Sequence, residues 1–343
     1  MTLTYTLLRF SNLRYSLIPL LAAPTLLLPA VPTSDSAIVP KQNLVSVSPP
    51  SQSSQINFQP SIKPTSPVIT PTTKTQTAKT PTKTPTKTKV AAPVHKPTDV
   101  ELKVAIAINV DTLTVGTSTT GIIRDEAGKL LRSLPAGVPF NLQASGNQID
   151  FGLWKSPNGV WLEATSGGYV GVGEHWYRGK VKLISRGSTL LAVNYVNLET
   201  YLYSVVGSEM PSSWPIDALK AQAVAARSYA LVRYLKPANP YYHIGTTQAW
   251  QVYKGLSGEA SSTYTAVELT RGQILTAQGS LVDAWYADTQ ETTDRAHDGK
   301  GMSQHGAKDL AKQGYDYTHI LGTYYPGSSL TPIQILAMAS GDR

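Results

Sequence analysis

Residues 197–230 read NLETYLYSVVGSEMPSSWPIDALKAQAVAARSYA and predict two helices joined by a short connection. Asn197 is a favourable N-cap for the first helix, and Gly207 stands where a left-handed glycine would end it. Pro215 fits the first position of the second helix. Glu209 therefore falls in the connection, where a side chain can face a cleft instead of a core.

The second helix carries two kinds of face. Apolar residues recur at three- and four-residue spacing, which predicts a packed face. Lys220 and Arg227 lie seven residues apart on another face. Alanines fill much of the helix and allow close approach to its neighbours, which suits a helix buried at the floor of a site. An ordinary core helix with two solvated bases would show the same pattern.

Two ordered blocks resemble the SpoIID/LytB family, which contains peptidoglycan lytic transglycosylases and amidase enhancers. The first block is residues 197–230, including the triplet Glu209-Met210-Pro211. The second begins with GMSQHGA at residues 301–307 and ends with YYPG at residues 324–327. The resemblance covers roughly residues 176 to 330 and does not reach the first hundred residues.

The resemblance implies that Glu209 is the catalytic glutamate. A glycosidic oxygen must be protonated as its bond breaks, and a Glu kept protonated by partial burial is a suitable general acid. Glycosidases usually need a second carboxylate. In a lytic transglycosylase the muramic acid 6-hydroxyl attacks C1 internally, so the same Glu can return as base. The product implied is a glycan chain ending in 1,6-anhydro-N-acetylmuramic acid.

Seven further residues are candidates for binding substrate. Lys220 and Arg227 match family positions and could bind a carboxylate of muramic acid or orient Glu209, with plain helix solvation as the alternative. A cation close to Glu209 would lower its pKa and burial would raise it, and the sequence leaves that balance open. The other five could hydrogen-bond sugar hydroxyls or stack on sugar faces, with structural duty as the alternative; they are His297, Ser303, Gln304, Tyr324 and Tyr325.

The second block departs from the family pattern in a way that bears on activity. Family members carry several dozen residues after the strand matched by residues 281–286, whereas here residues 287–295 run almost directly into the GMSQ motif. A wall of the substrate cleft is therefore expected to be shorter. A turn at residues 299–301 and a helix over residues 303–313, ended by Gly314, are expected to follow.

We expect no metal and no other cofactor. Some members of the family are thought to hold zinc through Cys and His near the shortened segment. This chain has no Cys, and His297 and His305 do not have a recognised metal spacing.

The N-terminus predicts export to the periplasm or cell wall. Arg9 and Arg14 precede an apolar stretch from about residue 17 to residue 31, the layout of a secretory signal peptide over residues 1–35. An uncleaved membrane anchor is the alternative, although three prolines interrupt the stretch and its length is marginal for a span.

Residues 36–98 predict a disordered linker, because they are rich in Pro, Ser, Thr and Lys and nearly lack large apolar side chains. They hold eight Lys and no acid, whereas residues 99–343 hold 20 bases against 21 acids. The net charge of +8 therefore lies outside the predicted domain and does not indicate a nucleic-acid groove. It indicates a cationic tether for anionic wall polymer or membrane, or a mere spacer.

The order of patterns predicts an α+β fold, with a β-rich part over residues 99–196 supporting a helical catalytic part over residues 197–335. Gly128, Gly146 and Gly187 predict turns, and residues 167–173 are interpreted as a flexible loop. Alternating apolar residues predict strands at 102–108, 112–115, 160–164, 181–184 and 190–196.

The function predicted from the sequence is that of an exported peptidoglycan lytic transglycosylase. Its partners would be peptidoglycan glycan strands and a cell-wall amidase, with no nucleic acid. Two alternatives stay open. One is a non-catalytic module that binds peptidoglycan and enhances an N-acetylmuramoyl-L-alanine amidase, and the other is a structural envelope protein.

Overall fold

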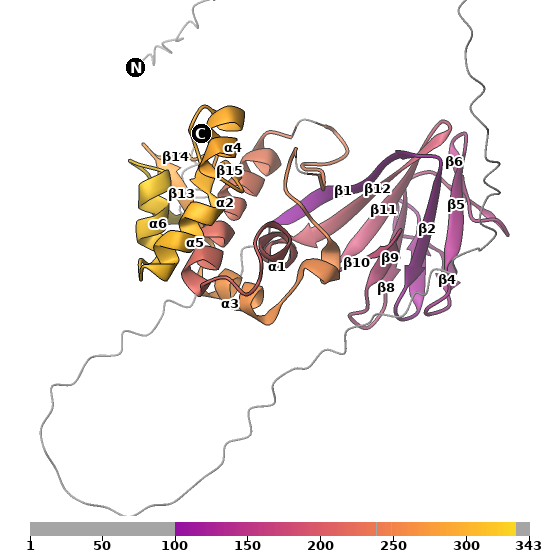
Figure 1. The fold of residues 1–343 in the computed structure, drawn as a ribbon. Helices are drawn as coiled ribbons and strands as arrows, with labels where there is room; N and C mark the ends of the chain where they lie inside the picture. Colours follow the sequence, from indigo (N-terminus) through magenta and orange to yellow (C-terminus); the bar gives the residue numbers. More distant parts are fainter. Residues whose placement is uncertain (1–99, 238, 248, 334–343) are drawn as a thin grey trace, which may run out of the picture. The chain divides into compact units, whose positions relative to one another are not determined.

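The computed structural model describes residues 100–237, 239–247 and 249–333, so the predicted signal peptide and linker lie outside the described residues. The first part of this region is built from strands and the second mainly from helices, which confirms the α+β prediction (Figure 1). The strands of the first part are β1 (Glu101–Val110), β2 (Thr112–Thr117), β3 (Gly121–Arg124), β4 (Leu130–Leu134), β5 (Phe140–Ser145), β6 (Gln148–Asp150), β7 (Lys155–Pro157), β8 (Val160–Ala164), β9 (Val170–Val172), β10 (His175–Tyr177), β11 (Lys180–Arg186) and β12 (Thr189–Asn197).

These strands form two sheets that share one core. The first sheet has the order β1-β12-β11-β8-β3-β4, and the second has the order β10-β9-β2-β5-β6-β7. Alternation places Val181 and Leu183 of β11 in the core while Lys180 and Lys182 face outward. Leu142 of β5 joins the same core from the second sheet. All five strands expected from alternating apolar residues are present.

The predicted turns are confirmed, because Gly128, Gly146 and Gly187 all have left-handed backbone conformations. The loop expected over residues 167–173 is wrong in part. Within it, β9 pairs with β10 on one side and with β2 on the other. Val170 and Val172 of β9 are buried, so this three-residue strand is an inner strand of the sheet that contributes to the core.

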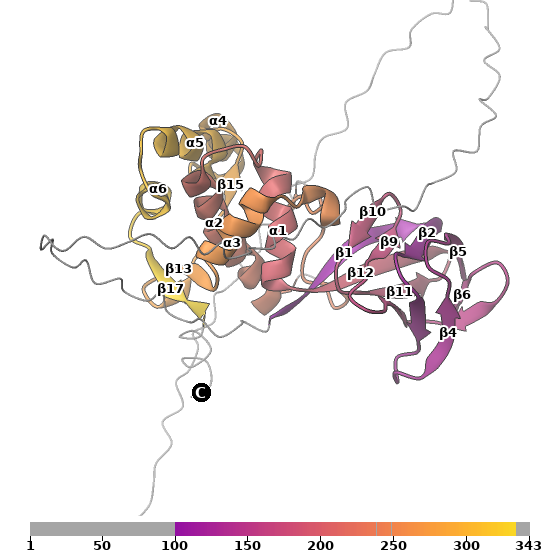
Figure 2. The ribbon, with the colours of Figure 1, turned by 90° about the horizontal axis from the view of Figure 1, so that it is seen from below.

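The second part places α2 at its centre, in contact with α1, α3, α5, α6 and β13 (Figure 2). Its alanines and Arg227 are buried, which confirms the prediction of a buried helix. The elements of this part are α1 (Leu198–Glu209), α2 (Ile216–Leu235), the 3₁₀ turn η1 (Gly255–Gly258), α3 (Ser261–Leu269), β13 (Gln273–Ala277), β14 (Ser280–Leu281), β15 (Tyr286–Ala287), α4 (Gln290–His297), β16 (Met302–Ser303), α5 (Gln304–Lys312), α6 (Tyr317–Tyr324) and β17 (Ser329–Pro332).

Helix α1 begins as predicted and ends later. The Asn197 side chain accepts a hydrogen bond from the Glu199 backbone N–H and caps the helix. Gly207 lies inside α1 and does not end it, which corrects the prediction. A Cβ at this position would lie 2.2 Å from the Gly258 carbonyl oxygen, so the glycine serves the close approach of η1. Pro215 is the N-cap of α2 and Ile216 is its first helical residue, so the helix begins one position later than expected.

The single strand expected at residues 281–286 is instead two short strands. Leu281 ends β14, and a bend follows in which the Trp285 N–H donates to the Asp283 carbonyl over 3.0 Å. Tyr286 then pairs in parallel with Met302 of β16, so β15 belongs to a different sheet from β14. Among the described residues, no helix is both long enough and apolar enough to cross a bilayer.

The two parts are joined by more than the chain connection between β12 and α1. The segment after α2 returns to β1, where Ile244 forms a parallel bridge with Val104. The Ala105 N–H donates to the Ile244 carbonyl over 2.9 Å, and the His243 N–H donates to the Lys103 carbonyl over 2.9 Å. A segment of the helical part therefore lies along the edge of the first sheet.

Candidate active site

Glu209 is the last residue of α1 and is only partly exposed. Its Oε1 accepts a hydrogen bond of 2.6 Å from the Val252 backbone N–H. Its Oε2 accepts from Nε2 of Gln304, at 3.4 Å. The carboxyl group is thus held between the segment 251–254 and the start of α5, two regions that are 43 and 95 residues away in the sequence.

Burial raises the pKa of Glu209 above its ordinary value, and it outweighs every other influence on that pKa. The hydrogen bonds from Val252 and Gln304 and the positive charge of Lys254 act in the opposite direction. The carboxyl group therefore keeps its proton to higher pH than an exposed Glu would. This is the state in which a carboxylic acid can donate a proton.

The segment 251–254 is fixed by a buried glutamine. Gln251 accepts from the Tyr201 hydroxyl at 3.0 Å, and its Nε2 donates to the Ala226 carbonyl at 3.1 Å and the Tyr286 hydroxyl at 2.9 Å. It thereby links α1, α2 and β15. Burial raises the pKa of Tyr201 and of Tyr286 well above the ordinary value, and the charge of Glu209 adds to both shifts.

A glycine positions the other end of this segment. Gly255 follows Lys254 with a left-handed φ of +57°, and a Cβ there would lie 2.0 Å from the Trp176 carbonyl oxygen. The turn can therefore approach β10 only as glycine. Lys254 is exposed at this turn and is the cation that lowers the pKa of Glu209.

Sequence reasoning missed Gln251, Val252, Lys254 and Tyr286. The contribution of Val252 is its backbone N–H, which no side-chain pattern reveals. Gln251 and Lys254 lie in a stretch without helical or alternating periodicity, and their role depends on a connection that only the fold shows. Tyr286 belonged to the predicted strand 281–286, where it had no assigned role.

The start of α5 is close to the prediction. Ser303 is its N-cap and accepts from the Gly306 N–H at 3.1 Å, and Gly314 follows its end with a φ of +92°. Gln304, at 5% exposure, is the predicted residue that the structure brings to Glu209. The expected sugar contacts of Ser303 and Gln304 stay predictions.

Arg227 does not reach a substrate site. It has no exposed surface and pairs with Glu199, with Nη2 at 2.7 Å from Oε2 and Nε at 3.0 Å from Oε1. Its Nη1 also donates to the Gln273 carbonyl at 3.0 Å. This corrects the expected contact with a muramic acid carboxylate, because a fully enclosed guanidinium cannot touch a ligand. The match to the family position reflects an internal ion pair.

Lys220 is likewise engaged within the protein. Its Nζ lies 3.1 Å from Oδ1 of Asp217 and 5.5 Å from the ring centroid of Tyr317. None of the main influences on the pKa of Glu209 comes from Lys220. Lys220 is therefore not simply solvated, because its contacts link the start of α2 to α6.

The remaining candidates are at the ends of α4 and α6 and differ in exposure. Tyr325 is buried and its hydroxyl donates to the Trp285 carbonyl at 2.6 Å, which corrects the expected stacking on sugar. Tyr324 is partly exposed beside Gly306, where a Cβ would lie 1.9 Å from its hydroxyl. The His297 ring stacks on Trp285 at 4.5 Å. Within the described ranges, no group of three or more His, Asp or Glu side chains could hold a metal ion.

Fold and site together define an α+β protein in which a two-sheet part precedes a helical part, with one partly buried glutamic acid at its candidate site. Residues 186–276 match the family described as Stage II sporulation protein, SpoIID. This region of the chain is therefore similar to the SpoIID family, in agreement with the resemblance that its motifs indicated. The match spans β12, α1, α2 and α3, and so includes Glu209.

Three relatives illustrate the similarity. An uncharacterized protein of Brachyspira hyodysenteriae is 36% identical over 141 residues, covering 40% of this chain and 38% of the relative. The amidase enhancer of Bacillus subtilis is 42% identical over 88 residues, covering 26% and 12%. Stage II sporulation protein D of Bacillus amyloliquefaciens is 37% identical over 115 residues, covering 29% and 33%. The chain thus spans less than two fifths of the length of each of these relatives.

Proposed function

We propose that this protein acts on the bacterial cell wall as a peptidoglycan lytic transglycosylase, with Glu209 as its catalytic acid and base. The observation that carries the proposal is the environment of Glu209, where burial raises the pKa of the carboxyl group while two hydrogen-bond donors hold its oxygens. The SpoIID match and the relatives named as an amidase enhancer and a sporulation protein support a function connected with the cell wall.

The chemistry begins with transfer of the Glu209 proton to the glycosidic oxygen that links C1 of N-acetylmuramic acid to the next sugar. The C1–O bond breaks, the next sugar leaves with a free hydroxyl, and positive charge develops at C1. The 6-hydroxyl of the same muramic acid then forms the new bond to C1. Glu209, now a carboxylate, takes the proton of that hydroxyl and returns to its starting state.

A single acid suffices for this reaction because no water has to be activated by a second carboxylate. Among the described residues, the main influences on the pKa of Glu209 include hydrogen-bond donors and the cation Lys254 but no second acid. Lys254 and the Val252 N–H favour the ionised form that exists midway through the reaction. Burial thus favours the protonated form of Glu209, and these neighbours favour its ionised form.

The location and partners belong to the same proposal. The charged and apolar pattern of residues 1–35 supports export to the periplasm or cell wall, where glycan strands are the substrate. A cell-wall amidase that removes stem peptides would be the partner suggested by the relative named amidase enhancer.

A second candidate function is that of a non-catalytic enhancer of such an amidase. The similarity of 42% over 88 residues to a protein named amidase enhancer favours it. The short connection before the GMSQ motif also favours it, because the eight-residue helix α4 is the element that the structure shows there. In this alternative the protein binds glycan and leaves it intact.

The test is incubation of the chain with intact and with peptide-stripped peptidoglycan, followed by mass spectrometry for anhydro-muramyl products. Glu209→Gln keeps the shape of the side chain and removes the acid, so product formation should fall by about 10²- to 10⁴-fold. Glu174→Gln, at an exposed acid between β9 and β10, is the matched control and should retain full activity.

The same samples decide between the two functions. If wild type and Glu209→Gln form no anhydro product on either substrate while both still sediment with the wall, the transglycosylase proposal fails. Stimulation of a purified amidase by both proteins would then support the enhancer function.

A further inference from the structure

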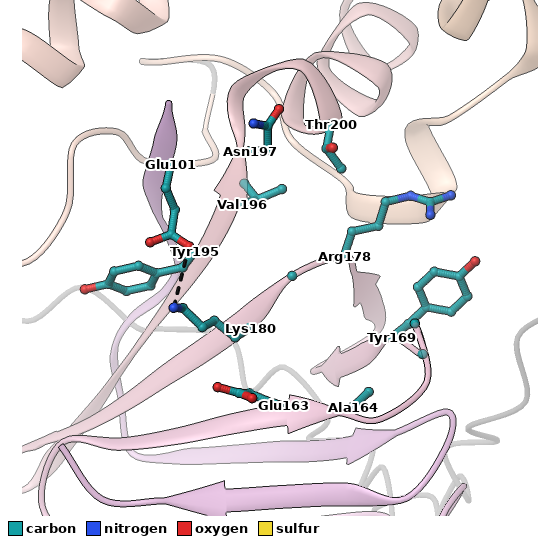
Figure 3. A pocket seen from close by; sticks show the side chains of 13 residues that line it. Glu101, Glu163, Ala164, Tyr169, Arg178, Lys180, Tyr195, Val196, Asn197 and Thr200 are labelled. Carbon is teal, nitrogen blue, oxygen red and sulfur yellow. Dashed lines mark ion pairs between the residues drawn. The ribbon is translucent and has the colours of Figure 1, made fainter. Parts of the chain in front are cut away.

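A cavity of about 620 Å³ lies where α1 leaves the first sheet (Figure 3). Its lining comes from β1, β8, β11, β12, the first turn of α1, and the loops before β9 and β11. Thr200 lines the cavity, and Glu209 lies nine positions further along α1, or about 14 Å along the helix axis. The cavity is therefore not part of the site around Glu209.

Two residues in the wall of this cavity are held in place by close packing and hydrogen bonds. Gly179 lies between Arg178 and Lys180 with a left-handed φ of +81°, and a Cβ there would lie 2.2 Å from the Tyr195 carbonyl oxygen. No side chain can therefore replace the glycine without moving β12. Arg178 is held in place at one wall, because its guanidinium donates to Glu259 at 2.9 Å and to the Tyr264 hydroxyl at 2.6 Å.

The charges of the cavity nearly cancel. Arg178 is paired with Glu259, and Lys180 lies 3.6 Å from Glu101. Glu163 lies on the outward face of the sheet and is partly exposed, and its carboxylate makes no hydrogen bond or ion pair with another described residue. A polyanion would meet Glu101 and Glu163, and a polycation would meet Arg178 and Lys180, so the cavity suits neither.

Aromatic rings flank the polar groups. Figure 3 shows Tyr195 and Tyr169 on opposite sides of the cavity, with Lys180 and Glu163 between them. The Trp161 ring meets that of Tyr195 edge to face, with centroids 4.6 Å apart. Aromatic rings offer an apolar surface to the C–H faces of a ligand, and the Glu163 carboxylate can accept hydrogen bonds from hydroxyl or amide groups of that ligand.

We propose that this cavity is a second glycan site, which binds an uncharged N-acetylated sugar residue. A sugar of this class has hydroxyl and amide donors for Glu163, an acetyl carbonyl for Lys180 or the Thr200 hydroxyl, and C–H faces for Tyr169 and Tyr195. That the sugar belongs to a peptidoglycan strand rests on the proposed function. The site would hold the strand by its glycan backbone while Glu209 acts elsewhere on it.

The test measures binding of the N-acetylglucosamine tetramer to the whole chain by isothermal titration calorimetry. Glu163→Gln replaces a charged acceptor by a neutral one of the same shape, so affinity should fall by about tenfold. Ala164→Phe, at the same wall, fills the cavity and should abolish binding. Glu174→Gln, the exposed acid used above as a control, should bind like wild type, and circular dichroism checks that each variant is folded.

Glu209→Gln separates this inference from the proposed function. Tetramer binding that survives in Glu209→Gln but weakens in Glu163→Gln supports the second site, whether or not wild type forms anhydro product. Binding that is the same in wild type, Glu163→Gln and Ala164→Phe overturns it, as does binding lost only in Glu209→Gln. Absence of tetramer binding to wild type also overturns it, while leaving the test for anhydro product to decide the proposed function.

Discussion

At Glu209, burial and hydrogen bonding act on the pKa in opposite directions, and each has a separate structural origin. Burial comes from the position of the residue at the end of α1, under the segment 251–254. The hydrogen bonds come from Val252 and Gln304. Because the raised pKa extends the range over which the acid is protonated, the rate of a reaction that needs the acid is constant below that pKa and falls above it.

Gln304 should tune this pH dependence. Gln304→Ala removes a donor that lowers the pKa of Glu209, so the pKa should rise further. The descending limb of the pH profile of kcat/KM for peptidoglycan should then move to higher pH, and the plateau should fall several-fold. Gln313→Ala, at an exposed residue at the other end of α5, is the control and should leave both unchanged. A lower plateau with an unmoved limb would show that Gln304 acts only on substrate.

Some residues of the candidate site could be predicted from the sequence and others could not. The motifs suggested Glu209 and Gln304 as site residues from the chemistry of their side chains, and the structure brings the two together. They also suggested Arg227, because the sequence does not distinguish an arginine that binds a ligand from one that pairs with Glu199. Val252 could not be found, since any residue except proline supplies an N–H.

The ion pair between Arg227 and Glu199 belongs to the scale of the element, because it joins α2 to α1. Arg227→Met should lower the free energy of unfolding by about 3–5 kcal/mol, since it leaves Glu199 buried without its cation. Urea denaturation measures the change. In the control Lys155→Met, the lost partner is Asp150 at 3.7 Å and the two side chains are 48% and 32% exposed, so the cost should stay below about 1 kcal/mol. Equal costs for the two variants would contradict the structural role given to Arg227.

Gly207 and Gly322 form a matched pair of helical glycines. Helix propensity alone favours Ala over Gly by about 1 kcal/mol. Gly322→Ala in α6 meets nothing within 4 Å and should gain part of that amount. Gly207→Ala should instead destabilise the protein and reduce activity, because its Cβ would push η1 away from α1 and disturb the segment that holds Glu209. Thermal unfolding of both variants checks the opposite signs, and a stabilised Gly207→Ala would contradict the packing argument.

Gly207 also explains why the end of α1 was wrongly predicted. A glycine near the end of a helical pattern most often marks its C-terminus. Here the requirement came from η1, some fifty residues later in the chain, and local sequence holds no trace of it. The start of α1 was predictable because the Asn197 cap acts within two residues.

On the scale of the whole molecule, the division into a β-rich and a helical part could be predicted, since alternation and helical periodicity are properties of each segment alone. The pairing of strands into two sheets could not, because it depends on contacts between distant segments. The assembly of the candidate site could not be predicted for the same reason, because its residues come from α1, the segment 251–254 and α5.

The uneven charge of the chain gives a prediction at this scale. Residues 36–98 hold eight Lys and no acid, so the chain should sediment with anionic wall material less well as the salt concentration rises from about 0.05 to 0.5 M. Replacing the eight Lys by Gln should remove the salt dependence, whereas replacing them by Arg should keep it. Salt dependence that persists after replacement by Gln would place the attraction in the remainder of the chain and support the spacer alternative.

The contact of residues 243–244 with β1 has a consequence for how the protein stays dispersed. β1 is the outer strand of its sheet, and an outer strand offers unpaired N–H and C=O groups to any other chain. The backbone of His243 and Ile244 occupies this row from Lys103 to Ala105. The helical part thus protects the β-rich part from self-association, and a fragment that stops before His243 would expose an edge at which copies could aggregate.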